Sequence, residues 1–423
     1  MTIPFFQTRL SRWSAAFIVG SFVFNVFNYL FTVVMGSLMS VASFGALNAT
    51  WAVFLLLSSM PTGTIGTLST RITSRLFGKR QKGGIARLLT SWYRWILFGS
   101  VVLAVGLIGI SMLFDLPRRP AATFLAIALP LALLSSLTNA VVQGTQRFSW
   151  NVAGMVGQPF LKLVASVVLV LLGFGLGGVY VGILCSFLVA HVVTLFALRD
   201  FFQRQHDHET PEDKTWQDVL PVVSATLGLT MLGTIDMIAV KQLFSPQDVG
   251  MYAAAITVSR VVFYVSTPIV SVLFPLLAAR HAAKGRYLHL FRQGAIVVVG
   301  SAVAIALFQA LFPTQWMVAV FLFSPKYLAA APLLPLLAVQ MVIGAFIHLF
   351  VHFFLATRLS NTMVLFPVGA TIPFVFYLLV HPNLEAIVLA SIVGHAVVLL
   401  GFVVAFVRVE WKAVRRKCAA LIK

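Results

Sequence analysis

Long apolar runs separated by short polar tracts dominate the pattern of the chain. A helix needs about 20 apolar residues to cross the hydrocarbon core of a bilayer. In lipid, each backbone group must find its hydrogen-bond partner within its own segment, so runs of this length are helical and a β-barrel is excluded. The pattern predicts an all-α polytopic membrane protein with spans at 14–38, 44–68, 91–114, 121–142, 151–173, 178–198, 219–243, 250–278, 294–314, 332–356, 362–380 and 385–407.

One apolar stretch, 313–330, fits no span of its own. We interpret it either as an outer loop or as a segment that inserts partway into the bilayer. The first run, in contrast, is too long for the core of a signal peptide, and it is expected to remain as an uncleaved first helix.

Positive charge lies almost entirely on one side of the predicted layout. If the N-terminus is cytoplasmic, nearly all Lys and Arg residues fall in the N-terminal segment, the even-numbered connections and the C-terminal tail. The other side carries only Arg118, Arg119, Lys326 and Lys241. Cytoplasmic loops of membrane proteins are enriched in Lys and Arg. The asymmetry therefore predicts an even number of helices with both termini in the cytoplasm.

Composition supports a lipid environment. Of the 423 residues, 60% are hydrophobic and 10% are charged, whereas soluble domains carry about 25% charged residues. The net charge of +19 does not indicate a nucleic-acid partner, because the basic residues lie in tracts between apolar runs and not on a soluble face. Cys185 and Cys418 provide no disulfide framework.

The longest polar stretch, 199–218, lies in the middle of the chain and suits a cytoplasmic linker. It divides the protein into an N-terminal six-helix bundle (1–198) and a C-terminal six-helix bundle (219–408), which is followed by a basic cytoplasmic tail (409–423).

The two halves resemble each other. In both, a glycine (Gly45, Gly250) opens the second helix, a proline (Pro61, Pro268) follows, and a basic loop comes next, at an offset of about 205 residues. An even number of helices per half predicts a parallel repeat about an axis along the membrane normal, an arrangement typical of transporters.

Two polar stripes are the strongest candidates for a binding site. Helical spacing places the members of each stripe on one helix face: Thr257, Arg260, Tyr264, Thr267 and Ser271 on one helix, and Ser21, Asn25, Asn28 and Thr32 on another. Together they predict a hydrated cavity between the halves. A guanidinium there would suit a phosphate, because its forked donors match phosphate oxygens. Alternatively, Arg260 pairs with Asp236 and locks two helices, and the polar stripes act as helix–helix contacts.

Ionisable residues inside a span are costly and mark functional sites by default. Lys162 is a candidate for a helper anion site, or for a side chain that reaches the interface. Asp236 and His395 are candidates for ion coupling, although Asp236 could instead pair with Lys241 or Arg260. No catalytic residue, metal site or cofactor is predicted, since the sequence has no P-loop, G-x-S-x-G or H-E-x-x-H motif.

Several segments resemble the polysaccharide and oligosaccharide flippases of the multidrug/oligosaccharidyl-lipid/polysaccharide exporter superfamily. The clearest is 235–286, in which Asp236 precedes a short turn, Gly250-Met251-Tyr252-Ala253-Ala254-Ala255 opens a helix, and Phe274-Pro275 lies near the helix end. Segments 28–82 and 334–361 also resemble the family. The resemblance implies a V-shaped, MATE-like pair of bundles, alternating access and a polyprenyl-diphosphate-linked sugar as substrate.

The resemblance also bears on the site. Arg260 matches the position at which related lipid-linked-precursor flippases keep a cavity arginine. The peptidoglycan-precursor flippases usually have fourteen spans and a basic cluster in helices 1 and 2, whereas helix 1 here carries the neutral Asn25 and Asn28. This difference favours an O-antigen, capsule or exopolysaccharide unit.

The sequence therefore predicts a flippase of the bacterial cytoplasmic (inner) membrane and not an enzyme. Its predicted partners are a lipid-linked oligosaccharide, the lipid bilayer and other polysaccharide-assembly membrane proteins, without nucleic acid. Three alternatives stay open: a multidrug or cation antiporter of the same fold, a membrane glycan polymerase or ligase, and a scaffold that transports nothing.

Overall fold

The computed structural model describes residues 9–113, 120–202, 216–283, 285, 287–312, 324–357, 363–380 and 382–421. Within these ranges the chain is helical and contains no strand. The first lobe is built from α1 (Arg9–Leu38), α2 (Val41–Gly78), α3 (Lys82–Leu113), α4 (Pro120–Gly144), α5 (Phe148–Leu169) and α6 (Gly175–Ala197). The second is built from α8 (Trp216–Leu243), α9 (Pro246–Ser259), α10 (Val261–Ala282), α11 (Tyr287–Leu311), α13 (Leu333–Ala356), α15 (Phe366–Gly369), α16 (Ile372–Leu379) and α17 (Leu384–Leu421).

The all-α polytopic fold is confirmed. In the described part of the chain, 10 helices are long and apolar enough to cross a membrane. One of them, Phe148–Ala197, covers 50 residues and contains two predicted spans, while the predicted span 362–380 falls on a shorter apolar segment, Phe366–Leu379. The described residues of each of the twelve predicted segments therefore lie mainly in helices, while residues 114, 313, 314 and 362 fall outside the description.

Glycine and proline explain why two segments differ from simple spans. Between α5 and α6, the π-helical turn Val170–Phe174 contains Gly173 at φ 90°, and Gly175 follows at φ 52°. Only glycine adopts such angles without strain, so the chain bends sharply there. In the predicted span 362–380, Pro367 and Pro373 each lie at the start of a short helix, α15 or α16. Proline fits the first turn of a helix, where its missing N–H costs no hydrogen bond, and a new helix begins at each of these two prolines. Proline alone does not end a helix here, since α2, α4, α5 and α8 each continue through one.

The predicted linker and tail lie partly outside the described residues. A short helix, α7 (Arg199–Phe202), begins the linker, and residues 203–215 are outside the description. Arg147 pairs with Asp200 of α7, and the hydrogen bond that it donates lowers the pKa of Asp200 below its ordinary value. At the other end, α17 continues without a break from the last span to Leu421, so the tail begins as helix.

The repeat is visible in the way the second helix of each lobe begins. The hydroxyl of Ser40 accepts a hydrogen bond from the Ser43 N–H at the start of α2, and the hydroxyl of Ser245 accepts one from the Asp248 N–H at the start of α9. The two capping serines have nearly the same backbone angles, φ −63° with ψ 154° and φ −63° with ψ 155°. A side-chain cap of this kind satisfies a backbone N–H in the first turn and so fixes the residue at which the helix begins.

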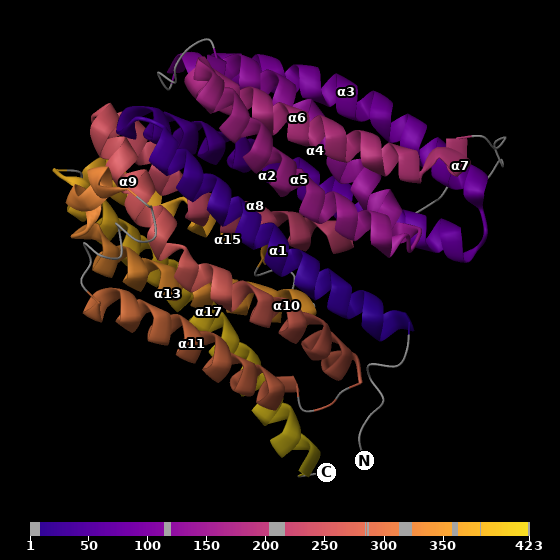
Figure 1. Cartoon of the computed structure of the whole chain (residues 1–423). Coiled ribbons are helices and arrows are strands. Elements are labelled where there is room, and N and C mark those ends of the chain that lie inside the picture. Colours follow the sequence, from indigo (N-terminus) through magenta and orange to yellow (C-terminus); the bar gives the residue numbers. More distant parts are fainter. Residues whose placement is uncertain are drawn as a thin grey trace.

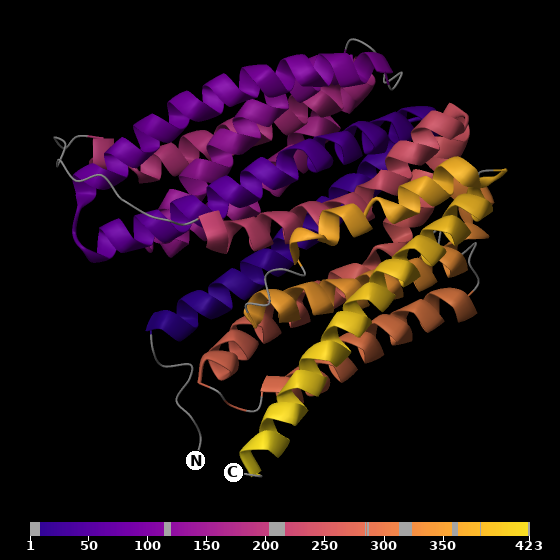
Figure 2. The ribbon, with the colours of Figure 1, turned by 180° about the vertical axis from the view of Figure 1, so that it is seen from behind.

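The two lobes converge at the end where α2 and α9 begin, and their helices diverge toward the end that holds Arg9 and Leu421 (Figures 1 and 2). At the convergent end the backbones of the two lobes touch. A β-carbon on Gly45 would lie 2.6 Å from the backbone N of Gly250, and one on Gly250 would lie 2.1 Å from the carbonyl O of Val41. Only glycine permits such an approach.

A second contact closes the same end. The 3-10 helix η2 (Pro325–Ala330) is the described part of the stretch 313–330; residues 313–323 lie outside the description. Lys326 donates hydrogen bonds to the carbonyl oxygens of Ser37 (2.9 Å) and Met39 (2.5 Å), and Tyr327 donates one to that of Gly36 (2.9 Å). A cation thus caps the negative end of the α1 dipole across the lobe boundary. Desolvation lowers the pKa of Lys326.

Replacing Lys326 with glutamine is expected to favour a state in which this end is open, because the charged contact to α1 is lost. Loss of a helix-end charge and of one charge-assisted hydrogen bond is expected to change the free-energy difference between the two states by about 0.6–1.4 kcal/mol. This corresponds to a shift of about three- to tenfold in the conformational equilibrium. Spin labels at Leu38 and Leu328, which are 41% and 40% exposed, would report the distance across the boundary once Cys185 and Cys418 are replaced by serine. Lys326→Arg, which keeps the charge, should leave the distance distribution unchanged.

Candidate functional site

A cavity of about 270 Å³ lies in the second lobe, next to the first. Its walls come from α8, α10, α13 and α17, and Leu55 of α2 contributes from the first lobe. The polar side chains that line it are Thr230, Thr234, Asp236, Arg260, Tyr264, Gln340 and His395. These residues are widely separated in the sequence, and helix packing brings them together around one cavity.

Arg260 lies at a one-residue break between two helices, and its own backbone stays helical, with φ −60°, ψ −16° and a hydrogen bond from its N–H to the Ile256 carbonyl. The structure divides the predicted span 250–278 into α9 and α10, with Arg260 between them. The side-chain amide of Gln309 donates to the carbonyl of Val258 at 3.1 Å, which supports the backbone next to the break. One terminal nitrogen of Arg260 donates to the carbonyl of Gly233 at 3.1 Å. The guanidinium has five N–H donors, so most of them remain for a ligand in the cavity.

Asp236 is fully buried and forms no ion pair with Arg260 in the described structure. Its carboxylate accepts hydrogen bonds from the Tyr252 hydroxyl at 2.8 Å and from the Met237 N–H at 2.7 Å. A direct Asp236–Arg260 lock is therefore not what holds these helices together, and the arginine keeps its charge for other contacts.

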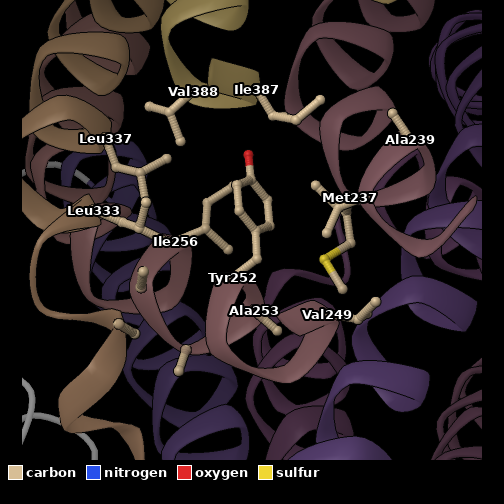
Figure 3. Close-up of a cluster of buried hydrophobic side chains, with 14 of the residues drawn as sticks. Met237, Ala239, Val249, Tyr252, Ala253, Ile256, Leu333, Leu337, Ile387 and Val388 are labelled. Carbon is tan, nitrogen blue, oxygen red and sulfur yellow. The ribbon is translucent and has the colours of Figure 1, made fainter. Parts of the chain in front are cut away.

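Tyr252 is positioned by an apolar cluster. Figure 3 shows its ring with Leu337 and Ile256 on one side and Met237 on the other, and its hydroxyl oxygen pointing toward Ile387 and Val388. The side chain is 0% exposed. Burial of this kind fixes the ring, so its hydroxyl holds the Asp236 carboxylate at one place on the cavity wall.

His395 and Gln340 complete the polar wall. The Nδ1 atom of His395 lies 2.8 Å from the carbonyl of Ser391 and 3.3 Å from the Ser391 hydroxyl, which in turn accepts from Tyr377 at 2.9 Å. Gln340 is 2% exposed, and its carbonyl oxygen Oε1 has no hydrogen-bond partner in the structure. A buried acceptor without a partner is costly unless a ligand or water meets it, so Gln340 marks a polar contact point for an occupant.

The stripe that contains Arg260 is only partly in the cavity. Tyr264 lines it, and its ring meets the Tyr29 ring of α1 edge-to-face at 6.5 Å across the two lobes. Thr257 and Thr267 donate to carbonyls of their own helix, those of Ala253 and Phe263. The side chain of Ser271 lies outside the description.

The helix 1 stripe meets Lys162 within the first lobe. Lys162 is 3% exposed and donates to the side-chain oxygen of Asn28, and its ammonium lies 4.3 Å from the Phe31 ring centre and 5.3 Å from that of Trp51. Thr32 donates to the carbonyl of Asn28, and Ser21 and Asn25 are half-buried on the same helix. Among described residues, no member of α1 or α5 lines the 270 Å³ cavity.

The sequence predicted Arg260, Tyr264, Asp236 and His395 as site residues, and in the structure all four line the same cavity. It did not select Gln340. A signal was present, because Gln340 is the only amide in the apolar helix Leu333–Ala356. The hydroxyl of Tyr252 was not foreseen as a partner of Asp236, although the two residues lie only 16 positions apart.

The arrangement can bind an anion and a polar group side by side. Arg260 supplies charged donors, Gln340 supplies a free acceptor, and the rings of Phe263 and Tyr264 supply apolar faces. Asp236 of α8 and His395 of α17 are both buried, and both line this cavity.

Comparisons with known proteins agree with this architecture. An inward-facing multidrug-resistance MATE family transporter of the MOP superfamily is similar in structure, with a TM-score of 0.73 and 17% identity over 92% of this chain and 94% of that one. A MOP superfamily transporter from Pyrococcus furiosus, described as having a binding pocket of reverse polarity, is also similar, with a TM-score of 0.65 and 17% identity over 94% of this chain and 95% of that one. These similarities show the fold. Curated protein sequences give no match.

A family model provides the identification. The model described as "Polysaccharide biosynthesis protein" matches residues 10–281, which include all of the first lobe except Arg9, the buried Asp236 and the break at Arg260. The match covers well over half of the chain, and this chain therefore belongs to the polysaccharide biosynthesis protein family.

Proposed function

We propose that this protein is a flippase that moves a polyprenyl-diphosphate-linked oligosaccharide across the cytoplasmic membrane for the synthesis of a surface polysaccharide. The observation that carries the proposal is Arg260, a cation on the cavity wall that is not paired with an acid in the described structure. A guanidinium binds phosphate oxygens through two parallel hydrogen bonds. The family match to polysaccharide biosynthesis supports a glycan-linked substrate.

The two lobes provide the path. They touch at the end of Gly45 and Gly250 and diverge at the end that the charge pattern assigns to the cytoplasm. In this state the sugar and diphosphate would enter from the inner leaflet while the polyprenyl tail remains in the bilayer. Rocking of the lobes would then close the cytoplasmic end and open the other, as in transporters built from two repeats.

The test is the location of the lipid-linked glycan in cells without this protein. If the proposal holds, the glycan accumulates on the inner leaflet, where an externally added glycosidase cannot reach it, and the wild-type gene restores export. A polymerase or ligase defect would instead leave single repeat units accessible on the outer leaflet. Accumulation on the outer leaflet would therefore refute the flippase.

Asp236 and His395 are proposed to couple an ion to transport. Replacing Asp236 with asparagine keeps the size and the contact with Tyr252 but removes the titratable carboxylate. We expect the variant to bind substrate and to lose about tenfold or more of the transport driven by a proton or sodium gradient. The measurement is the flipping rate in proteoliposomes with and without each gradient. An equal gradient dependence in wild type and Asp236→Asn would exclude this role.

A multidrug or cation antiporter is the second candidate, and two observations favour it. Asp236 and the rings of Phe263 and Tyr264 line the same cavity, and the similar structures include multidrug-resistance transporters. An organic cation would be drawn to an acid beside aromatic faces. Drug-sensitivity profiles of the deletion strain separate the two functions, since loss of resistance with normal glycan export would favour the antiporter.

A further inference from the structure

A basic face of α3 lies far from the cavity, on the outer side of the first lobe (Figure 1). A hollow of about 730 Å³ runs along it and is lined by Arg87, Thr90, Ser91, Arg94, Trp95 and Phe98. Their spacing places all six on one face of the helix. A second hollow of about 380 Å³ lies between α3 and α6 and is lined by Thr90, Tyr93, Arg94 and Leu195. Arg94 is common to both.

Arg94 itself has no protein partner in the described structure. Its side chain is exposed and forms no hydrogen bond, ion pair or ring contact with the described residues. The backbone around it is held in place, because the Tyr93 hydroxyl lies 2.9 Å from the Nε2 atom of the buried His191 on α6. The exposed guanidinium of Arg94 therefore extends from a part of α3 that is held against α6.

The position along α3 matches the edge of a bilayer. The helix has 32 residues, and a span of about 20 residues that ends near Leu113 would begin near Arg94. Arg87 lies two turns farther out, about 10 Å along the axis, which places it at the outer edge of a headgroup region about 5–8 Å deep. Trp95 and Phe98 are 71% and 66% exposed and lie on the hydrocarbon side of Arg94, as interfacial aromatic residues do.

The chain carries no acidic residue before the end of α3. The first acidic residue of the chain is Asp115, so the entire stretch that includes α2 and α3 carries positive charges alone. An occupant of this face must be partly apolar, to lie against Trp95 and Phe98, and negatively charged, to meet Arg94. Basic hollows between transmembrane helices on the cytoplasmic side bind anionic lipid headgroups.

We propose that the face formed by Arg87, Thr90, Ser91, Arg94, Trp95 and Phe98 is a binding site for an anionic phospholipid of the leaflet at the basic end of the protein. The phosphate would bind the guanidinium of Arg94, the hydroxyl of Ser91 would donate to one of its oxygens, and the acyl chains would lie on Trp95 and Phe98. This site is separate from the cavity of Arg260 and does not depend on the transported substrate.

The experiment is native mass spectrometry of the full-length protein with added phosphatidylglycerol or phosphatidylcholine of identical acyl chains. We expect wild type to retain phosphatidylglycerol about fivefold more strongly than phosphatidylcholine. This factor corresponds to the contribution of one basic residue near an anionic lipid surface. Arg94→Gln should lose that preference. Arg280→Gln is the matched control, because Arg280 is also exposed and lies in the last turn of α10 but lines neither hollow.

Two results would overturn the proposal. Equal retention of the two lipids by wild type would show that the face is ordinary lipid contact, and this comparison needs no variant. A preference that survives in Arg94→Gln but disappears in Arg280→Gln would place the anionic lipid on the second lobe. Arg94→Lys distinguishes charge from shape: a retained preference shows that charge is enough, and a lost one shows that the forked guanidinium is required.

Discussion

Replacing Arg260 with glutamate is expected to reduce glycan export by at least about 100-fold. A charge-assisted hydrogen bond contributes about 1.5–3 kcal/mol, so loss of the guanidinium alone predicts a decrease of about 10- to 100-fold. Glutamate adds repulsion between its carboxylate and a diphosphate. Arg260→Ala should therefore be impaired and Arg260→Glu inactive, whereas Arg260→Lys should be intermediate because it keeps the charge without the fork.

The measurement is the flipping rate of a fluorescent polyprenyl-diphosphate oligosaccharide in proteoliposomes, at protein amounts matched by immunoblot. Arg280→Glu is the control, since it introduces the same charge change at an exposed position of the adjoining helix, α10. Full activity of both Arg260→Ala and Arg260→Glu would show that this residue is not the anion site. If an organic cation is the substrate instead, Arg260→Glu should improve its transport.

Enlarging Gly250 is expected to hold the lobes apart at their convergent end. A β-carbon there would lie 2.1 Å from the carbonyl O of Val41 and 2.5 Å from its side chain. Because the obstruction includes backbone, a rotamer change cannot relieve it, and the lobes must separate. Overpacking of this kind costs about 1–3 kcal/mol, which corresponds to a shift of about 5- to 150-fold away from the state described here.

Spin labels at Leu38 and Leu328 would show the effect as a longer distance in Gly250→Ala and a still larger long-distance population in Gly250→Leu. Flipping should fall in parallel, because a transporter that cannot close one end cannot complete its cycle. Gly300→Leu is the control, since a β-carbon at Gly300 meets nothing within 4 Å. An unchanged distance in Gly250→Leu would mean that this contact does not set the conformation.

The helices could be predicted from hydropathy because apolar length is a local property of the chain. Boundaries were less predictable where backbone chemistry intervenes. Pro367 and Pro373 were visible in the sequence and divide one predicted span. The break at Arg260 has no proline or glycine at that position, and its support by Gln309 comes from a residue 51 positions away.

The site was predictable only where residues share one helix. Arg260 and Tyr264 lie on one face by spacing alone, but their meeting with Gln340 and His395 depends on how α8, α13 and α17 pack. The same limit explains Lys162. Its partner Asn28 is 134 positions away, and both residues lie in the first lobe. The spacing of polar residues along α1 shows which residues share a face of that helix, but not which other helix packs against that face.

The contact between Gly45 and Gly250 also has a consequence for how such a chain could arise. The two residues occupy equivalent places in the two halves, each five positions after its capping serine, so each meets the counterpart of itself. That is the geometry of an isologous interface, in which a residue on a twofold axis touches its own copy. An ancestral half-length chain that formed a homodimer would already possess this junction, and fusion of two copies would have preserved it while freeing each half to acquire its own cavity residues.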